Sequence, residues 1–373
     1  MINKDRLVKN FLRLAAVNSP TRHEAKIADI LEADLLKMGF EVCRDDAGEK
    51  IGGDTGNIIA RKKGTVPDAT PIMFSAHMDT VEPTDNWGYK LSDGVIKSNG
   101  ETILGADDKA GLAAIMEALT VMEEDGIPHG CIEVVFSIAE EIGLYGAKYL
   151  DIKKLQSGCA FVYDGGLPLG GVTISAPYHD NIKARIYGKN AHAGINPEEG
   201  VNAIAVASKA ISRMKLGRLD EETTANIGTI TGGTARNVVA AYCEVFGEAR
   251  SRTESKAKAQ VQHMEEEFKR AADEMGARVD IEIVRSYDGY KLPLDSQVVQ
   301  IAVEAAGRAG IEPKTHGAGG GSDANVLNAH GFPATVIGVG YTNPHSVDES
   351  LEIEDLVKSS AMALEIIKIA SGR

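Results

Sequence analysis

The hydrophobic pattern of residues 1–178 alternates between helical and strand-like periods. Apolar residues recur at helical spacing in three segments, which are residues 5–17, 24–38 and 110–123. Strand-like runs occupy residues 40–44, 57–61, 71–80, 131–138 and 159–163. The last two runs are almost continuously apolar, as in strands that are covered on both faces. Strands that alternate with helices in this way predict an α/β fold with a mostly parallel sheet and helices on both faces.

The pattern changes near residue 180 and returns to its first form near residue 290. The intervening elements read strand, helix, strand, strand, helix and strand, at residues 181–187, 201–214, 224–231, 238–249, 254–275 and 277–284. This order is the β-α-β-β-α-β, or ferredoxin-like, plan and is complete in itself. We therefore predict an inserted α+β domain over residues 179–286. Residues 1–178 and 287–373 would form one discontinuous domain, which ends with helices at 296–309 and 353–370 and a buried strand at 333–339.

Composition narrows the range of partners. The formal net charge of −14 argues against nucleic-acid binding and against a polybasic membrane anchor. The chain has no apolar run near the ~18 residues that a membrane span needs, and its polar first residues do not resemble a signal peptide. We interpret the four scattered cysteines as buried free thiols of a cytoplasmic protein, namely Cys43, Cys131, Cys159 and Cys243.

Polar residues stand where several of the apolar runs end. His77 and Asp79 close one run, Glu140 and Glu141 another, Asp164 a third, and His345 follows the last predicted strand. A further pair, Asp107-Asp108, precedes a predicted helix. Ligand sites of open α/β sheets lie beyond the carboxyl ends of the strands, so we expect these groups to converge.

Such a pocket requires positive charge, because carboxylates at close range raise one another's pKa values. His and carboxylate ligands without Cys suit Zn²⁺, with Mn²⁺ or Co²⁺ as alternatives. Charge balance favours two ions, since Asp107, Glu141, Asp164 and a bridging hydroxide together neutralise two divalent cations. Glu140 is then left as the base that takes a proton from the bridging water. Asp79 would accept the other ring N–H of His77 and fix its tautomer.

Each group alone also has a simpler explanation. A histidine after a strand is usually a surface residue, and adjacent glutamates usually form a solvated face. The Asp107-Asp108 pair could cap the following helix, and Asp164-Gly165-Gly166 could form a turn. The hypothesis of a metal centre depends on all of these groups occurring in one chain, each at the end of a strand or helix.

Taken together, these segments resemble the M20 family of di-zinc peptidases, in particular its peptidase T (tripeptidase) branch and the relatives of that branch. The resemblance covers the whole chain and is carried by His77-Met-Asp79, Gly105-Ala-Asp-Asp-Lys-Ala-Gly111, Ala139-Glu-Glu-Ile-Gly143, Tyr163-Asp-Gly165 and Pro344-His345.

The resemblance implies a role for each of these residues. One zinc ion would bind His77 and Asp164, the other would bind Glu141 and His345, and Asp107 would bridge them. Glu140 would be the general base and Asp79 an outer residue that supports the ligands. The peptide bond between Asp107 and Asp108 would be cis.

The predicted inserted domain also carries a segment of interest, Gly188-Lys-Asn-Ala-His-Ala-Gly194. By itself His192 reads as a turn residue. The segment resembles the lid of the family, whose histidine reaches the active site of the partner subunit and stabilises the oxyanion. The resemblance therefore implies a homodimer formed through a lid and dimerisation domain.

Substrate contacts are expected at two further places. Backbone N–H groups of Gly320, Gly321 and Ser322 could form an anion-binding nest, although the segment could also be a flexible linker. Asn237 and Arg250 match lid positions that bind the carboxylate end of the substrate in the family. Two other arginines, Arg236 and Arg252, are close rivals for this role.

The predicted function is a metal-dependent exopeptidase of the tripeptide aminopeptidase type, in which a metal-bridged hydroxide attacks a short peptide. The main alternative is an N-acyl-amino-acid amidohydrolase or deacetylase with the same metal site. A non-catalytic homologue should have lost Glu140 or a ligand, and all are present. A serine or cysteine hydrolase is disfavoured because no Gly-x-Ser-x-Gly segment occurs.

Overall fold

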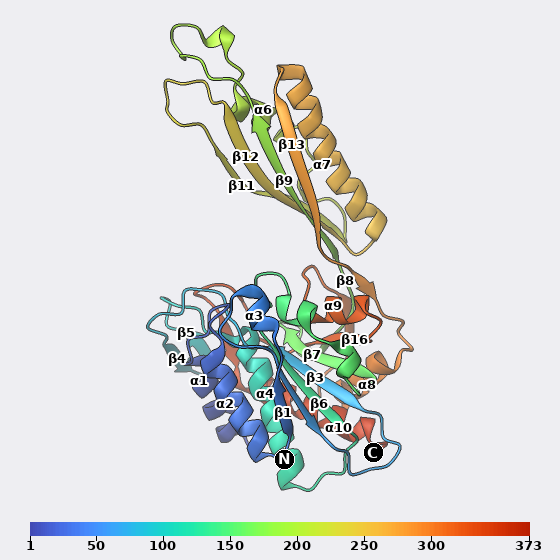
Figure 1. The fold of residues 1–373 in the computed structure, drawn as a ribbon. Coiled ribbons are helices and arrows are strands. Elements are labelled where there is room, and N and C mark those ends of the chain that lie inside the picture. Colours follow the sequence, from blue (N-terminus) through green and yellow to red (C-terminus); the bar gives the residue numbers. More distant parts are fainter. The chain divides into compact units, whose positions relative to one another are not determined.

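The computed structural model describes residues 1–373, which divide into two compact units. The first unit comprises residues 1–174, 292–317 and 322–373, and the second comprises residues 175–291 and 318–321. The second unit therefore includes the glycine-rich stretch 318–321, which lies far from the rest of it in the sequence. Figure 1 shows the elements of each unit.

The first unit is built on a mixed sheet with the strand order β1-β2-β6-β3-β7-β16-β8, and β15 pairs with β8. The four central strands, β6, β3, β7 and β16, are parallel, whereas β1, β2 and β8 join antiparallel. This agrees with the predicted mostly parallel sheet, and the antiparallel strands lie outside the parallel group. The bounds are β1 (Glu41–Arg44), β2 (Ile58–Lys62), β3 (Ile72–His77), β6 (Ile132–Ser137), β7 (Cys159–Gly165), β8 (Gly171–Ala176), β15 (Lys314–Gly317) and β16 (Ala334–Gly338).

Helices cover both faces of this sheet (Figure 1). Helix α4 leads from β3 to β6, and α5 leads from β6 back past β3 to β7, so right-handed crossovers place the two helices on opposite faces. Helices α1 and α10 pack against α4, α8 packs against α10, and α9 contacts α5. The bounds are α1 (Lys4–Ala15), α2 (Ala25–Lys37), α3 (Ala47–Ile51), α4 (Ala106–Glu124), α5 (Tyr145–Tyr149), α8 (Gln297–Arg308), α9 (Asp323–Ala329) and α10 (Ile353–Ala370), with a 3-10 turn at Ile152–Lys154.

The central strands form the core of the first unit. Every residue of β3 and of β6 is buried, and so are the first five residues of β7; for β6 and β7 the continuous apolar runs predict this burial. Phe74 of β3 packs against two aromatic rings of β7, with centroid distances of 6.1 Å to Phe161 and 5.9 Å to Tyr163. The ends of these strands are therefore held by tight packing, which gives the polar residues that follow them a fixed origin.

A small sheet that the sequence pattern did not predict completes the first unit. Its strand order is β17-β5-β4, with β4 at Tyr89–Ser92, β5 at Val95–Ser98 and β17 at Ser350–Glu352. All four residues of β4 are exposed, so the strand lacks the buried apolar face on which the prediction of a strand depends. In this sheet β17, which follows His345 in the chain, pairs with β5, which precedes Asp107.

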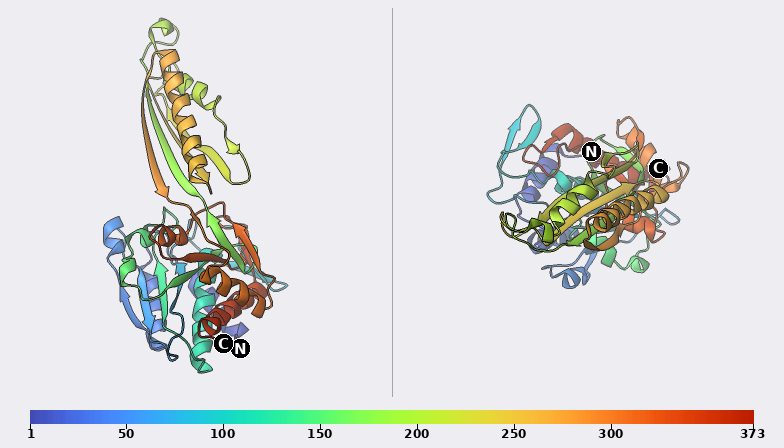
Figure 2. Two further views of the ribbon diagram at one scale, coloured as in Figure 1. Left: turned by 90° about the vertical axis from the view of Figure 1, so that its right-hand side faces the viewer. Right: turned by 90° about the horizontal axis from the view of Figure 1, so that it is seen from above.

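The second unit has an antiparallel sheet with the order β10-β11-β12-β9-β13, and α6 and α7 pack against one face of it around a common apolar core. In both views of Figure 2, α7 lies along the length of this sheet. The elements occur in the predicted β-α-β-β-α-β order, with the short β10 added. The bounds are β9 (Tyr178–Tyr187), α6 (Ala203–Ile211), β10 (Gly217–Arg218), β11 (Thr223–Gly232), β12 (Tyr242–Ser251), α7 (Glu254–Met275), β13 (Arg278–Tyr287) and β14 (Tyr290–Lys291), with a 3-10 turn at Pro197–Glu199.

Two sequence predictions are wrong in detail. Strand β12 begins at Tyr242 rather than at residue 238, because Val238 forms an isolated bridge with His192 in a loop. The four cysteines are free, but they are not all buried: Cys43 is exposed and Cys131 is half-buried. Cys43 lies on β1, whose residues are all at least partly exposed because it is an edge strand.

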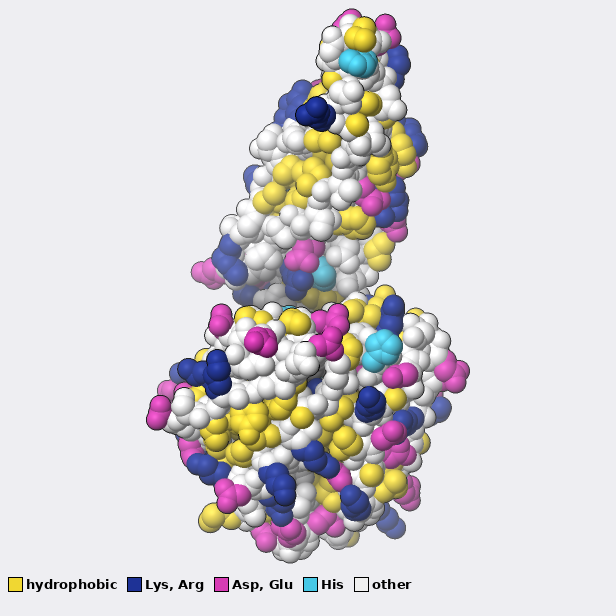
Figure 3. Space-filling model, turned by 90° about the vertical axis from the view of Figure 1, so that its left-hand side faces the viewer, with side chains coloured by type: hydrophobic (Ala, Val, Ile, Leu, Met, Phe, Trp, Pro, Cys, Tyr) yellow, Lys and Arg dark blue, Asp and Glu magenta, His cyan; other side chains and the backbone are white.

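The surface carries charged side chains of both signs, which are interspersed over the face drawn in Figure 3. None of the helices has the length and apolar character that crossing a membrane requires.

Candidate metal centre

The structure brings the five predicted metal ligands together at the carboxyl ends of the parallel strands. His77 is the last residue of β3, Asp164 lies near the end of β7, Glu141 lies in the turn after β6, and His345 lies in the loop after β16. Asp107 is in the first turn of α4. The five residues form two groups that share Asp107: His77, Asp107 and Asp164 in one, and Asp107, Glu141 and His345 in the other.

Asp107 presents a different carboxylate oxygen to each histidine. Its Oδ1 lies 3.1 Å from Nε2 of His77, and its Oδ2 lies 3.3 Å from Nε2 of His345. The outer ligands stand at similar distances from the same ring nitrogens. Asp164 Oδ1 is 3.6 Å from His77 Nε2, and Glu141 Oε2 is 3.1 Å from His345 Nε2. One carboxylate thus belongs to both groups, as the carboxylate of a bridging ligand would.

Both groups fit a divalent cation. Two ligand atoms that each lie ~2.1 Å from a tetrahedral Zn²⁺ are about 3.4 Å apart, which matches the separations between the facing atoms. In addition, Glu141 Oε1 is buried without a hydrogen-bond partner. A buried, unpartnered carboxylate oxygen beside imidazole and carboxylate donors is a place where a cation would replace the missing interaction. The ligand role of these five residues stays a prediction.

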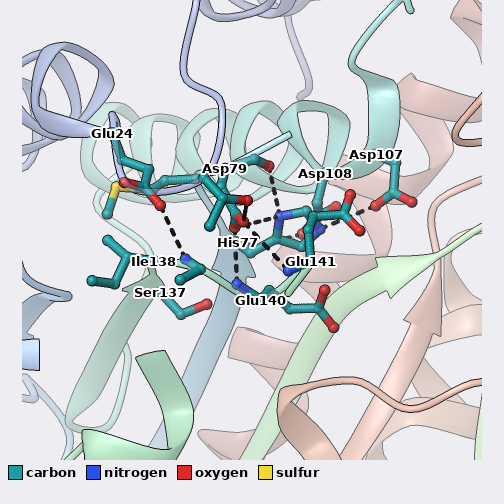
Figure 4. Close-up of polar contacts among 12 residues, drawn as sticks. Glu24, His77, Asp79, Asp107, Asp108, Ser137, Ile138, Glu140 and Glu141 are labelled. Carbon is teal, nitrogen blue, oxygen red and sulfur yellow. Dashed lines mark hydrogen bonds and ion pairs between the residues drawn. The ribbon is translucent and has the colours of Figure 1, made fainter. Parts of the chain in front are cut away.

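Asp79 connects His77 to the Glu140-Glu141 pair (Figure 4). The carboxylate of Asp79 accepts hydrogen bonds from the backbone N–H groups of Glu140, at 3.0 Å, and Glu141, at 3.3 Å. The nearest acceptor for Nδ1 of His77 is the backbone carbonyl of Asp79, at 2.8 Å, while the carboxylate lies 3.4 Å away. Asp79 therefore orients His77 mainly through its main chain, and its side chain holds the turn that carries the two glutamates.

Glu140 belongs to neither of the two groups. It begins a tight turn in which its carbonyl accepts hydrogen bonds from the N–H groups of Gly143 and Leu144, at 2.9 and 2.8 Å. Desolvation, and next the charge of Asp164, raise the pKa of the Glu140 carboxyl well above its usual value. The residue is thus a titratable group beside the predicted ligands that has no ligand role of its own.

Burial and the neighbouring charged groups also determine which residues of the centre hold protons in the metal-free protein. Burial opposes a charged His77, but the carboxylates of Asp107 and Asp164 outweigh burial and raise the pKa of His77 well above its usual value. Hydrogen bonds to Asp107 and Glu141 raise the pKa of His345 to about 10. Burial raises the pKa of Asp164 to about 7. Without a cation, the centre therefore holds protons that a cation would displace.

The peptide bond between Asp107 and Asp108 is cis, as the resemblance implies. Asp108 is fully buried, and its Oδ2 accepts a hydrogen bond of 3.2 Å from the backbone N–H of His77. The two aspartates thus have separate surroundings, with Asp107 facing the histidine rings and Asp108 facing the β3 backbone.

Three buried acidic residues near the centre were not assigned from the sequence. Glu24 accepts a hydrogen bond of 3.0 Å from the N–H of Ala139, and Asp323 accepts one of 2.5 Å from the hydroxyl of Ser137. Glu349 accepts three backbone N–H groups near Asp107. Burial raises the pKa values of these residues to about 7, 6 and 7 respectively. Asp323 directly follows the Gly320-Gly321-Ser322 stretch that the sequence analysis identified. Nothing in the sequence distinguishes Glu24 and Glu349 from solvated acidic residues.

Two predicted residues of the second unit, His192 and Asn237, are neighbours. The loop around His192 forms a bridge to Val238, and the N–H of Ala193 donates to the carbonyl of Asn237 at 3.0 Å. His192 is exposed, and its Nδ1 accepts a hydrogen bond of 3.2 Å from Gly194. The catalytic role of His192 and the substrate role of Asn237 stay predictions.

Arg250 is already paired within the second unit. Its Nε and Nη2 donate to the carboxylate of Glu248 at 3.0 and 2.9 Å, and its Nη1 lies 3.4 Å from the Tyr287 hydroxyl. Glu248 also faces His179, at 3.0 Å. A substrate carboxylate at Arg250 would therefore have to replace or share an existing partner. The rival Arg252 donates to the carbonyls of Ala318 and Glu221, at 3.4 and 3.1 Å.

The residues of the glycine-rich stretch differ in their surroundings. A Cβ at Gly321 would lie 2.3 Å from the ring of Tyr287, so this position requires glycine, whereas Gly320 faces open space. Ser322 belongs to the first unit and caps α9, with its N–H bonded to Asn325 Oδ1 at 3.1 Å. This N–H is committed to the cap, so an anion nest would have to rely on the glycines.

Comparison with known proteins finds related sequences and structures that cover the whole chain. The model of the peptidase family M20/M25/M40 matches residues 73–369. A structure of the aminopeptidase PepT from Bacillus cereus ATCC 10987 is 42% identical with a TM-score of 0.91, and a tripeptidase structure from Staphylococcus aureus subsp. aureus Mu50 is 41% identical with a TM-score of 0.96. Each of these two alignments covers 100% of the present chain and 100% of the similar chain. The protein YqjE of Bacillus subtilis (strain 168), described as uncharacterized, is 44% identical over 371 residues and 100% of each chain.

The raised carboxylate pKa values predict how the metal-free protein responds to pH. Asp164, with a pKa of about 7 when folded against 3.8 otherwise, and Glu140 keep protons in the folded state that the unfolded chain loses. Their contribution to stability is therefore present below pH ~4 and is lost as the pH rises toward 7. Divalent ions should remove this loss, because they would bind Asp164 as an anion, and their charge would favour the anion of the neighbouring Glu140 as well. We expect the gap in Tm between metal-loaded and chelator-treated protein to be wider at about pH 7.5 than at about pH 5.5. An equal gap at both pH values would contradict this prediction.

Proposed function

The chain belongs to the peptidase family M20/M25/M40 and is a peptide-bond hydrolase, and on this premise we propose that it is a metal-dependent exopeptidase that cleaves short peptides in the manner of a tripeptide aminopeptidase. The observation that carries the proposal is the sharing of Asp107 between two ligand groups, with Glu140 beside them and in neither. Two Zn²⁺ ions suit these donors, and Mn²⁺ or Co²⁺ are alternatives.

The proposed division of labour follows from the geometry. His77 and Asp164 would hold one ion, Glu141 and His345 would hold the other, and Asp107 would bind both through its separate oxygens. When bound, the ions would polarise the scissile carbonyl and lower the pKa of the attacking water. The remaining steps are proton transfers and positioning by side chains.

Glu140 would act as the general base and then as the general acid. It would take a proton from the attacking water and return that proton to the leaving amine. Its pKa is raised in the metal-free protein by burial and by the charge of Asp164, and neutralisation of that charge by bound cations would favour the anion that accepts the proton. Asp79 would keep Glu140 in place, because its carboxylate binds the backbone N–H groups of Glu140 and Glu141. Asp79 would also orient His77 through its carbonyl.

The second unit would act as a lid and dimerisation domain. His192, which is exposed on a loop, would reach the active site of a partner subunit and stabilise the oxyanion. Asn237, Arg250 and the backbone N–H groups of Gly320 and Gly321 would bind the carboxylate end of the peptide, whereas the N–H of Ser322 is used by the α9 cap. The aminopeptidase and tripeptidase names of the two similar structures support a substrate with free ends. The four free cysteines support a cytoplasmic location.

An N-acyl-amino-acid amidohydrolase is the competing function, since the same ligands and base hydrolyse either amide. The two activities differ in the group on the amino side of the scissile bond. In a peptide this is a residue with a charged α-amino group, and in the alternative it is a neutral acyl group.

The first prediction concerns substrates. Zinc-loaded protein should hydrolyse free tripeptides, with less turnover of dipeptides and none of N-acetyl amino acids, and a chelator should abolish the activity. A colorimetric assay of released amine on the three substrate classes, run in parallel with and without chelator, measures this. Turnover of N-acetyl amino acids in place of tripeptides would contradict the peptidase proposal and support the N-acyl-amino-acid amidohydrolase.

The second prediction concerns the base. Glu140→Gln should lower kcat by ~10²–10⁴-fold, because the amide cannot accept the proton of water. The variant should still bind both ions, since Glu140 belongs to neither ligand group. Glu41→Gln, which removes an exposed glutamate of β1, is the matched control and should leave kcat unchanged. Near-normal turnover by Glu140→Gln would exclude this role.

The third prediction concerns the shared active site. His192→Ala and Glu140→Gln should each be nearly inactive alone. When the two are mixed and allowed to exchange subunits, heterodimers with one intact site should form, and part of the activity should return. Absence of regained activity, with exchange verified by mass spectrometry of differently tagged chains, would rule out a histidine that acts on the partner.

A further inference from the structure

Glu349 is buried in the loop that carries His345, with a relative exposure of 1%. Both of its carboxylate oxygens accept backbone hydrogen bonds from the segment that leads into α4. Oε2 accepts from the N–H groups of Leu104 at 2.8 Å and Gly105 at 2.7 Å, and Oε1 accepts from the N–H of Asp107 at 2.9 Å. A single carboxylate therefore binds three N–H groups, the last of which belongs to the residue that both ligand groups share.

The main chain of Glu349 is itself fixed. Its carbonyl accepts a hydrogen bond of 3.0 Å from the N–H of Ser98, at the end of β5. The next residue, Ser350, begins β17, which pairs with β5. Ser350 also exchanges backbone hydrogen bonds of 2.9 and 3.1 Å with Thr342, at the other end of the His345 loop. The carboxylate thus extends from a rigid base and closes the loop on which His345 lies.

The hydrogen-bonding chemistry of this site requires a carboxylate. All three partners are N–H donors, and an ionised carboxylate accepts at both oxygens. A glutamine would offer one acceptor and would turn an NH₂ group toward the remaining N–H donors. The three hydrogen bonds that the carboxylate accepts offset the unfavourable burial of this polar group.

We propose that Glu349 is a positioning residue for the metal centre, which ties the His345 loop to the Asp107 segment so that both ligands of the second group are held ready for a cation. The inference rests on the proposed function, because it assigns to Asp107 and His345 the role of metal ligands. Glu349 belongs to neither ligand group and would act through the backbone of residues 104–107.

The experiment measures zinc binding directly. Metal-free wild-type protein, Glu349→Gln, Glu349→Asp and the control Glu352→Gln are titrated with Zn²⁺ against a chromophoric chelator. Glu352 is exposed, lies three residues further along the same segment, and makes no capping hydrogen bond. We expect Glu349→Gln to weaken zinc binding by about 10–100-fold, as loss of a residue that supports metal ligands does elsewhere. Glu349→Asp keeps the charge and should recover part of the affinity, and Glu352→Gln should bind like the wild type.

Two readouts separate positioning from a purely structural role. If Glu349 positions the ligands, excess Zn²⁺ should restore the kcat of Glu349→Gln, and the KM of this variant should stay near the wild-type value. Equal zinc affinities for Glu349→Gln and Glu352→Gln, whatever the Tm of the metal-free variants, would overturn the inference. If Glu349→Gln does not fold, the decision passes to Glu349→Asp, for which wild-type zinc affinity would overturn it and weakened affinity would support it. A wild-type protein that fails to bind two ions would instead overturn the proposed function.

Discussion

Asp107 faces two histidines with two different oxygens, and this arrangement places heavy electrostatic demands on its surroundings. Carboxylates this close together disfavour one another's ionised forms. Burial, and after it the charge of Asp107, raise the pKa of Asp164 from 3.8 to about 7, which corresponds to on the order of 4 kcal/mol against its anion in the metal-free protein. A divalent cation in each ligand group would offset that energy. The fold therefore builds a centre that is poorly satisfied by itself and is suited to cations.

The ligands are held by backbone contacts from other buried acids. Asp79 binds the N–H groups of Glu140 and Glu141, Glu24 binds that of Ala139, and Glu349 binds those that lead to Asp107. Each of these is a charge-assisted hydrogen bond to a segment between regular elements. Loops without such contacts would leave the ligand side chains mobile, and buried N–H groups without acceptors would be unfavourable. The acids around the centre thus fall into two sets: some side chains belong to the two predicted ligand groups, and others hold the loops.

The sequence predicts the part of this arrangement that depends on buried strands. Glu140 and Asp164 follow runs that are almost continuously apolar, and this pattern is typical of a strand that is covered on both faces. The strand order is a long-range property that the hydrophobic pattern does not give, so the proximity of the two groups at Asp107 was an expectation, carried by the family resemblance, until the structure placed them. Glu349 was not predicted, because the sequence pattern around one acidic residue in a polar loop is the same whether that residue is solvated or buried. For a related reason the exposed strand β4 was missed, since it has no buried face to produce a pattern.

Selection among amide substrates would then fall to residues outside the ligand set, because the ligands and Glu140 serve any scissile amide. Arg250 shows how such selection could work. Its guanidinium is engaged by Glu248 through two hydrogen bonds, so an incoming carboxylate gains only the difference between its own contacts and those that it displaces. Exchange of this kind yields little affinity but penalises substrates whose terminal group is neutral or misplaced. An arginine that is paired in the resting protein is therefore compatible with a role in recognising a free peptide end, and it favours specificity over tight binding.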